Sequence, residues 1–125
     1  MKHQKFSIRK RINSFGYAFN GLKILVREEH NARIHLLSAF FTVIAAILLK
    51  VSAIEWVALV LAMGFVITIE IINSAIENIA NFISPERHDT IKIIKDLSAA
   101  GVLLSAVTAL VIGLIIFLPK ILFLF

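Results

Sequence analysis

The stretch at residues 67–81, ITIEIINSAIENIAN, decides how this chain is expected to fold. It is apolar enough to cross a membrane, yet it carries two glutamates, Glu70 and Glu77, seven residues apart. At about 3.6 residues per helical turn, these carboxylates share one face with Asn73, Ser74 and Asn81. Charged side chains inside a membrane segment are costly and by default mark a functional site. The stretch therefore predicts a transmembrane helix with one polar, functional face.

The composition of the whole chain is that of a membrane protein. Hydrophobic residues make up 59% of its 125 positions, and the mean hydropathy is +0.92, which is too apolar for a soluble domain of this size. The length predicts a single integral-membrane domain, residues 1–125, with too little interior to bury a polar stripe, so we expect an oligomer. Because the chain has no cysteine, disulfides and thiolate metal sites are excluded.

The distribution of apolar and basic residues predicts an all-α fold, with a surface helix followed by three membrane crossings. Residues 1–33 mix basic and apolar side chains at helical spacing, which indicates an amphipathic helix lying on the membrane surface. Apolar runs predict crossings at about 34–50, 56–83 and 90–118, the last of them ended by Pro119.

The positions of Lys and Arg predict how these helices are oriented. Eight of the 13 lie in residues 1–33, and the loop 84–96 carries more. The positive-inside rule places both segments in the cytoplasm, where basic residues beside a membrane contact anionic lipid; we therefore expect no nucleic-acid partner. The polar half of the second crossing, the polar start of the third, and Glu28 and Glu29 then converge at one face of the membrane.

On the residues alone, this set of groups fits phosphoryl transfer from a nucleotide. Mg²⁺ in such sites takes one or two carboxylates together with substrate phosphates, which Glu77 with Glu28 or Glu29 could provide. Lys95 could neutralise phosphate charge. Glu70, deeper in the helix, could act as general base for a hydroxyl that reaches it from the bilayer.

Two other classes of function stay open at this point. Known nucleotide motifs are absent, and a buried pair of glutamates also fits a small proton-coupled transporter or channel. Such a protein needs a continuous polar path, which the first half of the second crossing, residues 57–69, lacks. A structural or regulatory membrane protein would instead tolerate the loss of both glutamates. His30 and His35 are expected to be structural, because no further His or Cys completes a metal site.

Residues 70–77, EIINSAIE, resemble the signature of the prokaryotic integral-membrane diacylglycerol kinase family, E-[LIV]-[LI]-N-[ST]-A-[IV]-E. Other segments are similar to the same family in the same order along the chain. They are Gly16-Tyr17, Gly21-Leu22, the E-x-N-x-R-x-H run at 29–35, Lys95-Asp96, and Ala99-Ala100-x-Val102-Leu103.

The resemblance implies a homotrimer in the bacterial cytoplasmic membrane that phosphorylates a lipid alcohol with ATP and Mg²⁺, with its N-terminus and active site on the cytoplasmic side. It implies that Glu70 is the proton acceptor that meets the lipid, that Glu29 and Glu77 bind the metal, and that Asn73 supports the site. The nucleotide contacts that it implies are Tyr17, Glu29, Glu77, Glu86, Arg87, His88, Lys95 and Asp96.

Two lipid alcohols are known substrates in this family: diacylglycerol, which becomes phosphatidic acid, and undecaprenol, which becomes undecaprenyl phosphate. The segments 29–35, 52–56 and 113–120 look more like the undecaprenol kinase branch, so undecaprenol is the favoured substrate. One position departs from the family: Asn81 stands where an aspartate is usual, which removes a charge and keeps the size and hydrogen bonding.

Overall fold

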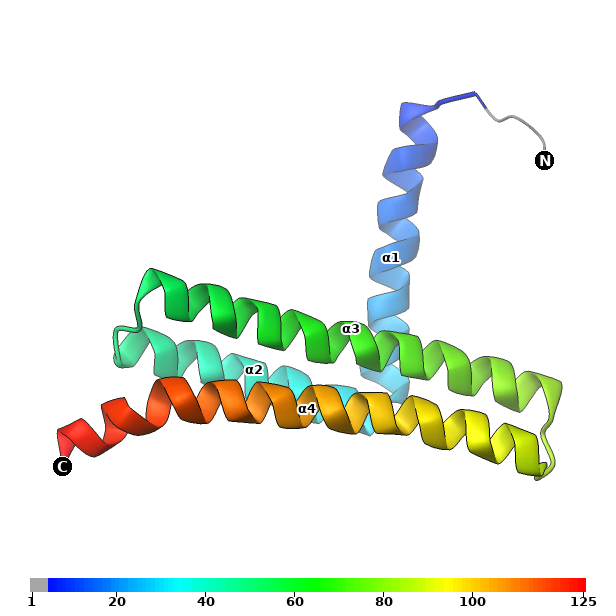
Figure 1. The fold of residues 1–125 in the computed structure, drawn as a ribbon. Helices are drawn as coiled ribbons and strands as arrows, with labels where there is room; N and C mark the ends of the chain where they lie inside the picture. The colour runs from blue at the N-terminus through cyan, green and yellow to red at the C-terminus, as the bar shows by residue number, and fades with distance from the viewer. Residues whose placement is uncertain (1–4) are drawn as a thin grey trace.

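The computed structural model describes residues 5–125, and they form four α-helices joined by short connections (Figure 1). The helices are α1 (Ile8–Glu28), α2 (His30–Leu48), α3 (Ala53–Ile83) and α4 (Asp89–Leu124). α2, α3 and α4 lie side by side as a bundle, and α1 leaves the bundle and runs across its long direction (Figure 1). No strand occurs in residues 5–125, so the all-α prediction is confirmed. Residues 1–4 of the expected surface segment lie outside the described part.

Three of the helices are long and apolar enough to cross a membrane: α2, α3 and α4, with 19, 31 and 36 residues. Many of their apolar side chains are exposed in the single chain, including Phe41, Leu61 and Leu103. A membrane helix needs no water-facing side, so such surface suits lipid or another copy of the chain. The prediction of three membrane helices behind an amphipathic surface helix is confirmed.

One extended residue, Glu29, separates α1 from α2 and turns the chain through a corner. Its backbone has φ −109° and ψ 111°, outside the helical region. Arg33 closes the corner, because its Nε donates to the carbonyl of Val26 at 2.6 Å and another guanidinium N–H donates to that of Arg27. α2 therefore begins at His30, earlier than the predicted start at 34, and includes polar residues that precede the apolar run.

α3 begins at Ala53, earlier than the predicted start at 56, because Ser52 and Glu55 form a capping box. The hydroxyl of Ser52 accepts from the N–H of Glu55 at 3.2 Å, and the Glu55 carboxylate accepts from the N–H of Ser52 at 2.9 Å. The helix ends at Ile83, two residues before Pro85, since a proline disfavours helical backbone in the residue that precedes it.

The prediction that Pro119 ends the last membrane helix is wrong. α4 continues through this proline to Leu124, and Figure 1 shows its red end bending away from the straighter part. A proline removes one backbone donor and kinks a helix, while in a membrane the other backbone groups still need helical hydrogen bonds. Lys120 follows directly, and its Nζ donates to Oε2 of Glu55 at 2.8 Å, which ties this turn of α4 to α3.

The connection between α2 and α3 is tight and contains one strained residue, Lys50. The N–H groups of Lys50 and Val51 donate to the carbonyls of Ile47 and Ala46 at 3.3 and 3.2 Å, the Schellman pattern that ends a helix. Lys50 has a φ of 54°, in the left-handed region, which costs a residue with a side chain about 1 kcal/mol relative to glycine. The buried cluster beside this turn consists of Ala46, Val51, Leu59 and Ile116, with Trp56 packed against it.

Candidate functional site

The polar face of α3 is turned into the bundle, as its spacing predicts. Glu70, Asn73 and Ser74 are all buried, and Glu70 is the most deeply buried of the three, with 1% of its surface exposed. α3 packs against both α2 and α4, which cover this face from two sides. A carboxylate buried so deeply in an apolar bundle destabilises the fold unless a partner compensates it, so its surroundings decide what it can do.

The nearest basic group to the Glu70 carboxylate is the imidazole of His35 on α2. Nε2 of His35 lies 3.3 Å from Oε1 of Glu70, and the two side chains are 22% and 2% exposed. Apart from this contact with His35, Oε1 is buried without a hydrogen-bond partner among residues 5–125. An unpartnered carboxylate oxygen is open to accept a hydrogen bond from a hydroxyl group that enters the bundle.

Two further carboxylates, Glu29 and Glu77, lie close enough for their charges to repel that of Glu70. Glu29 comes from the corner between α1 and α2, and its Oε1 accepts from the hydroxyl of Ser74 at 3.2 Å. Glu77 lies on α3, about one turn beyond Ser74, and is half-buried. Glu77 makes no side-chain hydrogen bond or ion pair within the described residues, so its oxygens are available for a ligand.

Glu29 and Glu77 are the carboxylates that could hold a magnesium ion whose other ligands come from a substrate. No group of three or more His, Cys, Asp or Glu side chains in residues 5–125 could enclose a metal by itself. Mg²⁺ is commonly bound by one or two carboxylates and takes its other oxygens from phosphates and water. Two carboxylates, one already oriented by Ser74, match that requirement.

α4 supplies polar partners for the same face of α3. Asn73, which lies between Glu70 and Glu77 in the sequence, accepts at its Oδ1 from the hydroxyl of Ser98 at 2.6 Å. This hydrogen bond orients the side-chain amide of Asn73. Lys95 donates from Nζ to Oδ1 of Asn81 at 2.5 Å. Asn81 therefore keeps a hydrogen bond to the lysine at the position where the resembled family has a charge.

The remaining residues predicted to contact nucleotide lie away from this group within one chain. Tyr17 is 75% exposed on α1, about 18 Å along the helix from the corner at Glu29. Asp96 is exposed and forms an ion pair with Lys92 at 2.6 Å. The other three lie exposed in the connection from α3 to α4: Glu86, Arg87 and His88. These roles stay predictions.

The loop does, however, contain one residue with an evident structural role. Nδ1 of His88 accepts from the backbone N–H of Thr90 at 3.1 Å, so this side chain caps the first turn of α4. A histidine that caps a helix through Nδ1 keeps Nε2 free to face outward.

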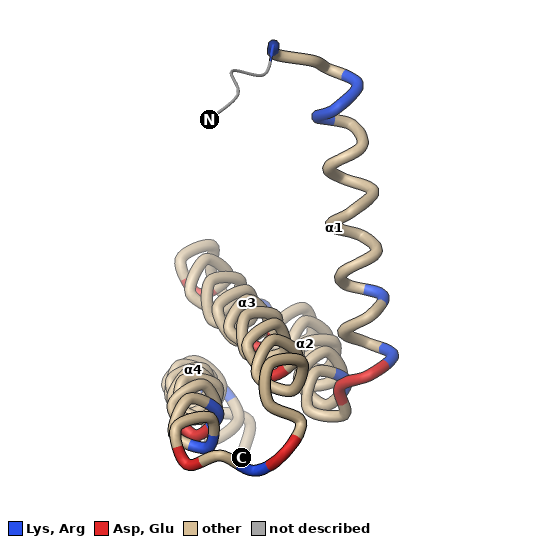
Figure 2. Tube along the Cα trace, turned by 90° about the vertical axis from the view of Figure 1, so that its right-hand side faces the viewer, with Lys and Arg blue, Asp and Glu red and all other residues tan. Residues whose placement is uncertain are grey.

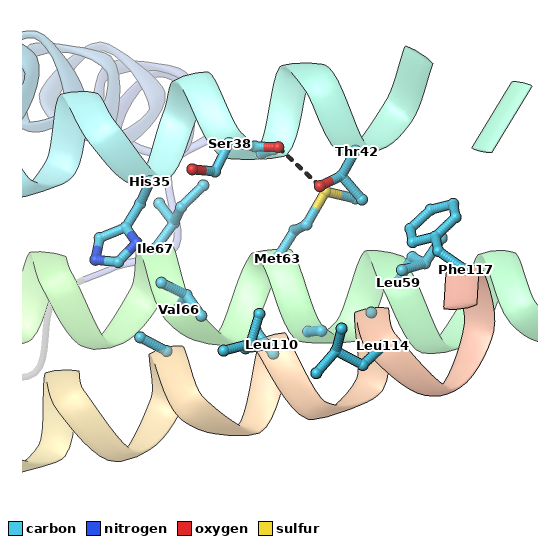
Figure 3. Close-up of a pocket in the computed structure, with 15 residues that line it drawn as sticks. His35, Ser38, Thr42, Leu59, Met63, Val66, Ile67, Leu110, Leu114 and Phe117 are labelled. Carbon is cyan, nitrogen blue, oxygen red and sulfur yellow. Dashed lines mark hydrogen bonds between the residues drawn. The ribbon is translucent and has the colours of Figure 1, made fainter. Parts of the chain in front are cut away.

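A cavity of about 420 Å³ adjoins the carboxylate site and was not predicted (Figure 3). Side chains of α2, α3 and α4 line it, and His35 lies at the end nearest Glu70. The polar side chains beyond His35 are Ser38 and Thr42, whose Oγ1 donates to the carbonyl of Ser38 at 2.7 Å. The other walls are apolar and include Leu59, Val66, Leu110, Leu114 and Phe117.

The contact between His35 and Glu70 was also missed, because His35 was expected to be structural. A signal was present: His35 belongs to the same 29–35 run as Glu29, at the polar start of an otherwise apolar helix. That run places Glu29 at the corner and His35 on α2, and both side chains reach the polar face of α3.

A bundle of three membrane-length helices with a buried carboxylate beside an apolar cavity defines a class of membrane protein with a functional site inside the bundle. The family model described as prokaryotic diacylglycerol kinase matches residues 16–117. The chain belongs to this family, as its signature at 70–77 indicates.

Individual relatives agree with the family. The chain is 34% identical to an undecaprenol kinase of Bacillus subtilis over 95% of this chain and 97% of that protein. It is 34% identical to a diacylglycerol kinase of Synechocystis over 87% of this chain and 63% of that protein. It is 32% identical to a diacylglycerol kinase of Escherichia coli over 80% and 82% of the two chains. The prediction of a lipid kinase in a multi-pass membrane protein is confirmed at this level.

Proposed function

We propose that this protein transfers the γ-phosphate of ATP to the hydroxyl of a membrane lipid alcohol, with Glu70 as the general base. The observation that carries the proposal is the buried Oε1 of Glu70, which makes no hydrogen bond in residues 5–125 and lies 3.3 Å from Nε2 of His35, a residue that lines one end of an apolar cavity. A lipid whose chain occupies that cavity would bring its hydroxyl to this oxygen.

The reaction then follows from the positions of the side chains. The lipid oxygen forms a bond to the γ-phosphorus while the bond to the bridging oxygen of ADP breaks, and Oε1 of Glu70 accepts the hydroxyl proton. His35, 3.3 Å from this oxygen, stabilises the carboxylate before transfer and holds it toward the cavity. The apolar walls keep water out, which limits hydrolysis of ATP.

Glu29 and Glu77 would hold Mg²⁺ in this proposal. When bound, Mg²⁺ supplies positive charge to the phosphates and orients the γ-phosphate. Ser74 holds the Glu29 carboxylate in place through its hydroxyl, and Asn73 is fixed by Ser98 beside them. Lys95, oriented by Asn81, adds a positive charge on the α4 side.

We further propose that the protein is a homotrimer in the bacterial cytoplasmic membrane, with the carboxylates at the cytoplasmic side. Figure 2 supports this orientation, because Lys and Arg lie along α1, at its corner and in the first turns of α4. The exposed apolar faces of α2, α3 and α4 support self-association. Tyr17 and the 86–88 loop lie away from Glu70 within one chain, so a nucleotide contact from them is more easily made between copies.

Undecaprenol is the favoured lipid over diacylglycerol. The undecaprenol kinase of Bacillus subtilis matches the chain along nearly its full length.

The proposal is tested by phosphate transfer from labelled ATP, with purified protein in mixed micelles that contain either undecaprenol or diacylglycerol. Mg²⁺-dependent labelling of undecaprenol at a higher kcat/KM is the expected result. Faster labelling of diacylglycerol overturns the choice of lipid and leaves the kinase proposal standing. Labelling of neither lipid by folded protein contradicts the proposed function itself.

A further inference from the structure

A second cavity, also of about 420 Å³, lies at the end of the bundle where α2 joins α3, away from Glu70. It is formed where the end of α2 and the following turn meet the last turns of α4, beyond Pro119. Two of its lining residues are lysines and the rest are apolar. They are Leu48, Leu49, Lys50, Pro119, Lys120, Phe123 and Leu124.

One of the two lysines already has a structural role. Nζ of Lys120 donates to Oε2 of Glu55 at 2.8 Å, and the other oxygen of Glu55 accepts from the backbone N–H of Ser52 at 2.9 Å. The charge of Lys120 is therefore neutralised within the fold, and its ammonium is held at the edge of the cavity.

The other lysine, Lys50, is strained and has no such role. Its φ of 54° is a conformation that favours glycine, and the two backbone hydrogen bonds of this turn need no side chain. Its side chain is exposed and makes no hydrogen bond or ion pair with the residues that the structure describes. A non-glycine residue in a strained conformation points to a use for its side chain.

We propose that this cavity binds an anionic membrane lipid, with the Lys50 ammonium on the lipid phosphate and the lipid chains against Leu49, Phe123 and Leu124. Apolar walls beside a cation, at the end of helices that cross the membrane, fit an anionic amphiphile better than a free phosphate ion.

A second copy of the chain fits this cavity less well than a lipid. Of the eight Asp and Glu residues, only Glu55 lies on this side of Glu70, and Lys120 already pairs with it. A neighbouring copy in the same orientation therefore offers no unpaired carboxylate at this depth to Lys50, whereas an anionic lipid offers a phosphate.

Trp56 provides a local measurement, because it is the single tryptophan and packs against the cluster that contains Val51. The full-length protein is placed in phosphatidylcholine vesicles that contain brominated phosphatidylglycerol or, for comparison, brominated phosphatidylcholine. Quenching of Trp56 in the two series gives the relative binding constant of the anionic lipid near this residue. For one lysine at a membrane surface we expect a preference of about fivefold for phosphatidylglycerol.

Matched variants separate this site from the basic residues of α1. Lys50→Gln should reduce the preference to about one, Lys50→Arg should retain it, and Lys23→Gln, an exposed lysine of α1, should leave it unchanged. A wild-type preference of about one, or a preference that survives Lys50→Gln, overturns the proposal. The first result is the one expected if another copy of the chain fills the cavity and excludes lipid from it.

Discussion

Two glutamates of α3, Glu55 near one end of the helix bundle and Glu70 in its interior, have opposite surroundings. Near one end, both oxygens of Glu55 are partnered, one by Lys120 and one by the backbone of Ser52. Deeper in the bundle, Glu70 has an oxygen with no hydrogen bond in the described chain, beside His35 and two more carboxylates. A satisfied carboxylate stabilises a fold, whereas an unsatisfied one is open to chemistry, so we expect Glu55 to be structural and Glu70 to be the catalytic group.

The largest expected effect is on turnover, which should depend on Glu70 and not on Glu55. Glu70→Gln removes the proton acceptor and keeps the size of the side chain, so kcat should fall about 10³-fold while Mg-ATP binding changes little. Phosphate transfer from labelled ATP and calorimetric binding of the nucleotide measure the two quantities. Glu55→Gln, on the same helix, is the matched control and should retain turnover. Equal losses of turnover in both variants would contradict a catalytic role that is specific to Glu70.

A smaller effect is expected from Glu77→Gln, which should act on binding. If Glu77 holds the metal, the variant weakens Mg²⁺-dependent nucleotide binding. Ser74→Ala, which removes the hydroxyl that orients Glu29, should weaken it by about 10–100-fold. Titration of Mg²⁺ at fixed nucleotide measures both changes. Unaltered Mg²⁺ dependence in Glu77→Gln would show that this carboxylate is not a ligand.

Filling the cavity beside Glu70 should lower the activity toward the lipid and leave nucleotide binding unchanged. An added Cβ at Gly113 meets nothing within 4 Å, and this residue lines the cavity, so Gly113→Leu places a side chain in the path of the lipid. We expect kcat/KM for the lipid to fall about tenfold, with Mg-ATP binding unchanged. Gly64→Leu is the control, because Gly64 is equally open and does not line the cavity. Equal rates for the two leucine variants would argue against this path.

At the other end of the bundle, the same kinds of change should alter stability. Glu55→Gln breaks the ion pair to Lys120 and keeps an oxygen for the capping box, so the free energy of unfolding should fall slightly. Unfolding in detergent mixtures with increasing SDS measures this change. The losses of stability in Glu55→Gln and Lys120→Gln should not add in the double variant, since each substitution removes the same ion pair.

The last expected effect is a gain in the stability of the fold. Lys50→Gly relieves a φ of 54° and should stabilise the fold by about 1 kcal/mol in the same SDS titration, although glycine adds some freedom to the unfolded chain. Lys50→Gln keeps the strain and serves as the control, with little change in stability. No gain in the glycine variant would show that the turn holds lysine without strain.

The sequence by itself determined the helices and much of the site. Apolar runs predicted three membrane helices, and the spacing of Glu70, Asn73, Ser74 and Glu77 predicted their common face. Both follow from periodicity along one helix, which depends on residues that are neighbours in the chain. The signature at 70–77 in addition indicated the family.

Contacts between helices were decided only by the tertiary structure. The corner at Glu29 brings that carboxylate to Ser74, and the packing of α2 brings His35 to Glu70. α4 continues past Pro119, and the next residue, Lys120, forms an ion pair with Glu55, which lies 65 residues away in the chain. Such contacts depend on how helices cross and where a chain turns, which no periodicity of a single helix specifies. The sequence thus determined which groups face inward, and the packing decided which groups meet.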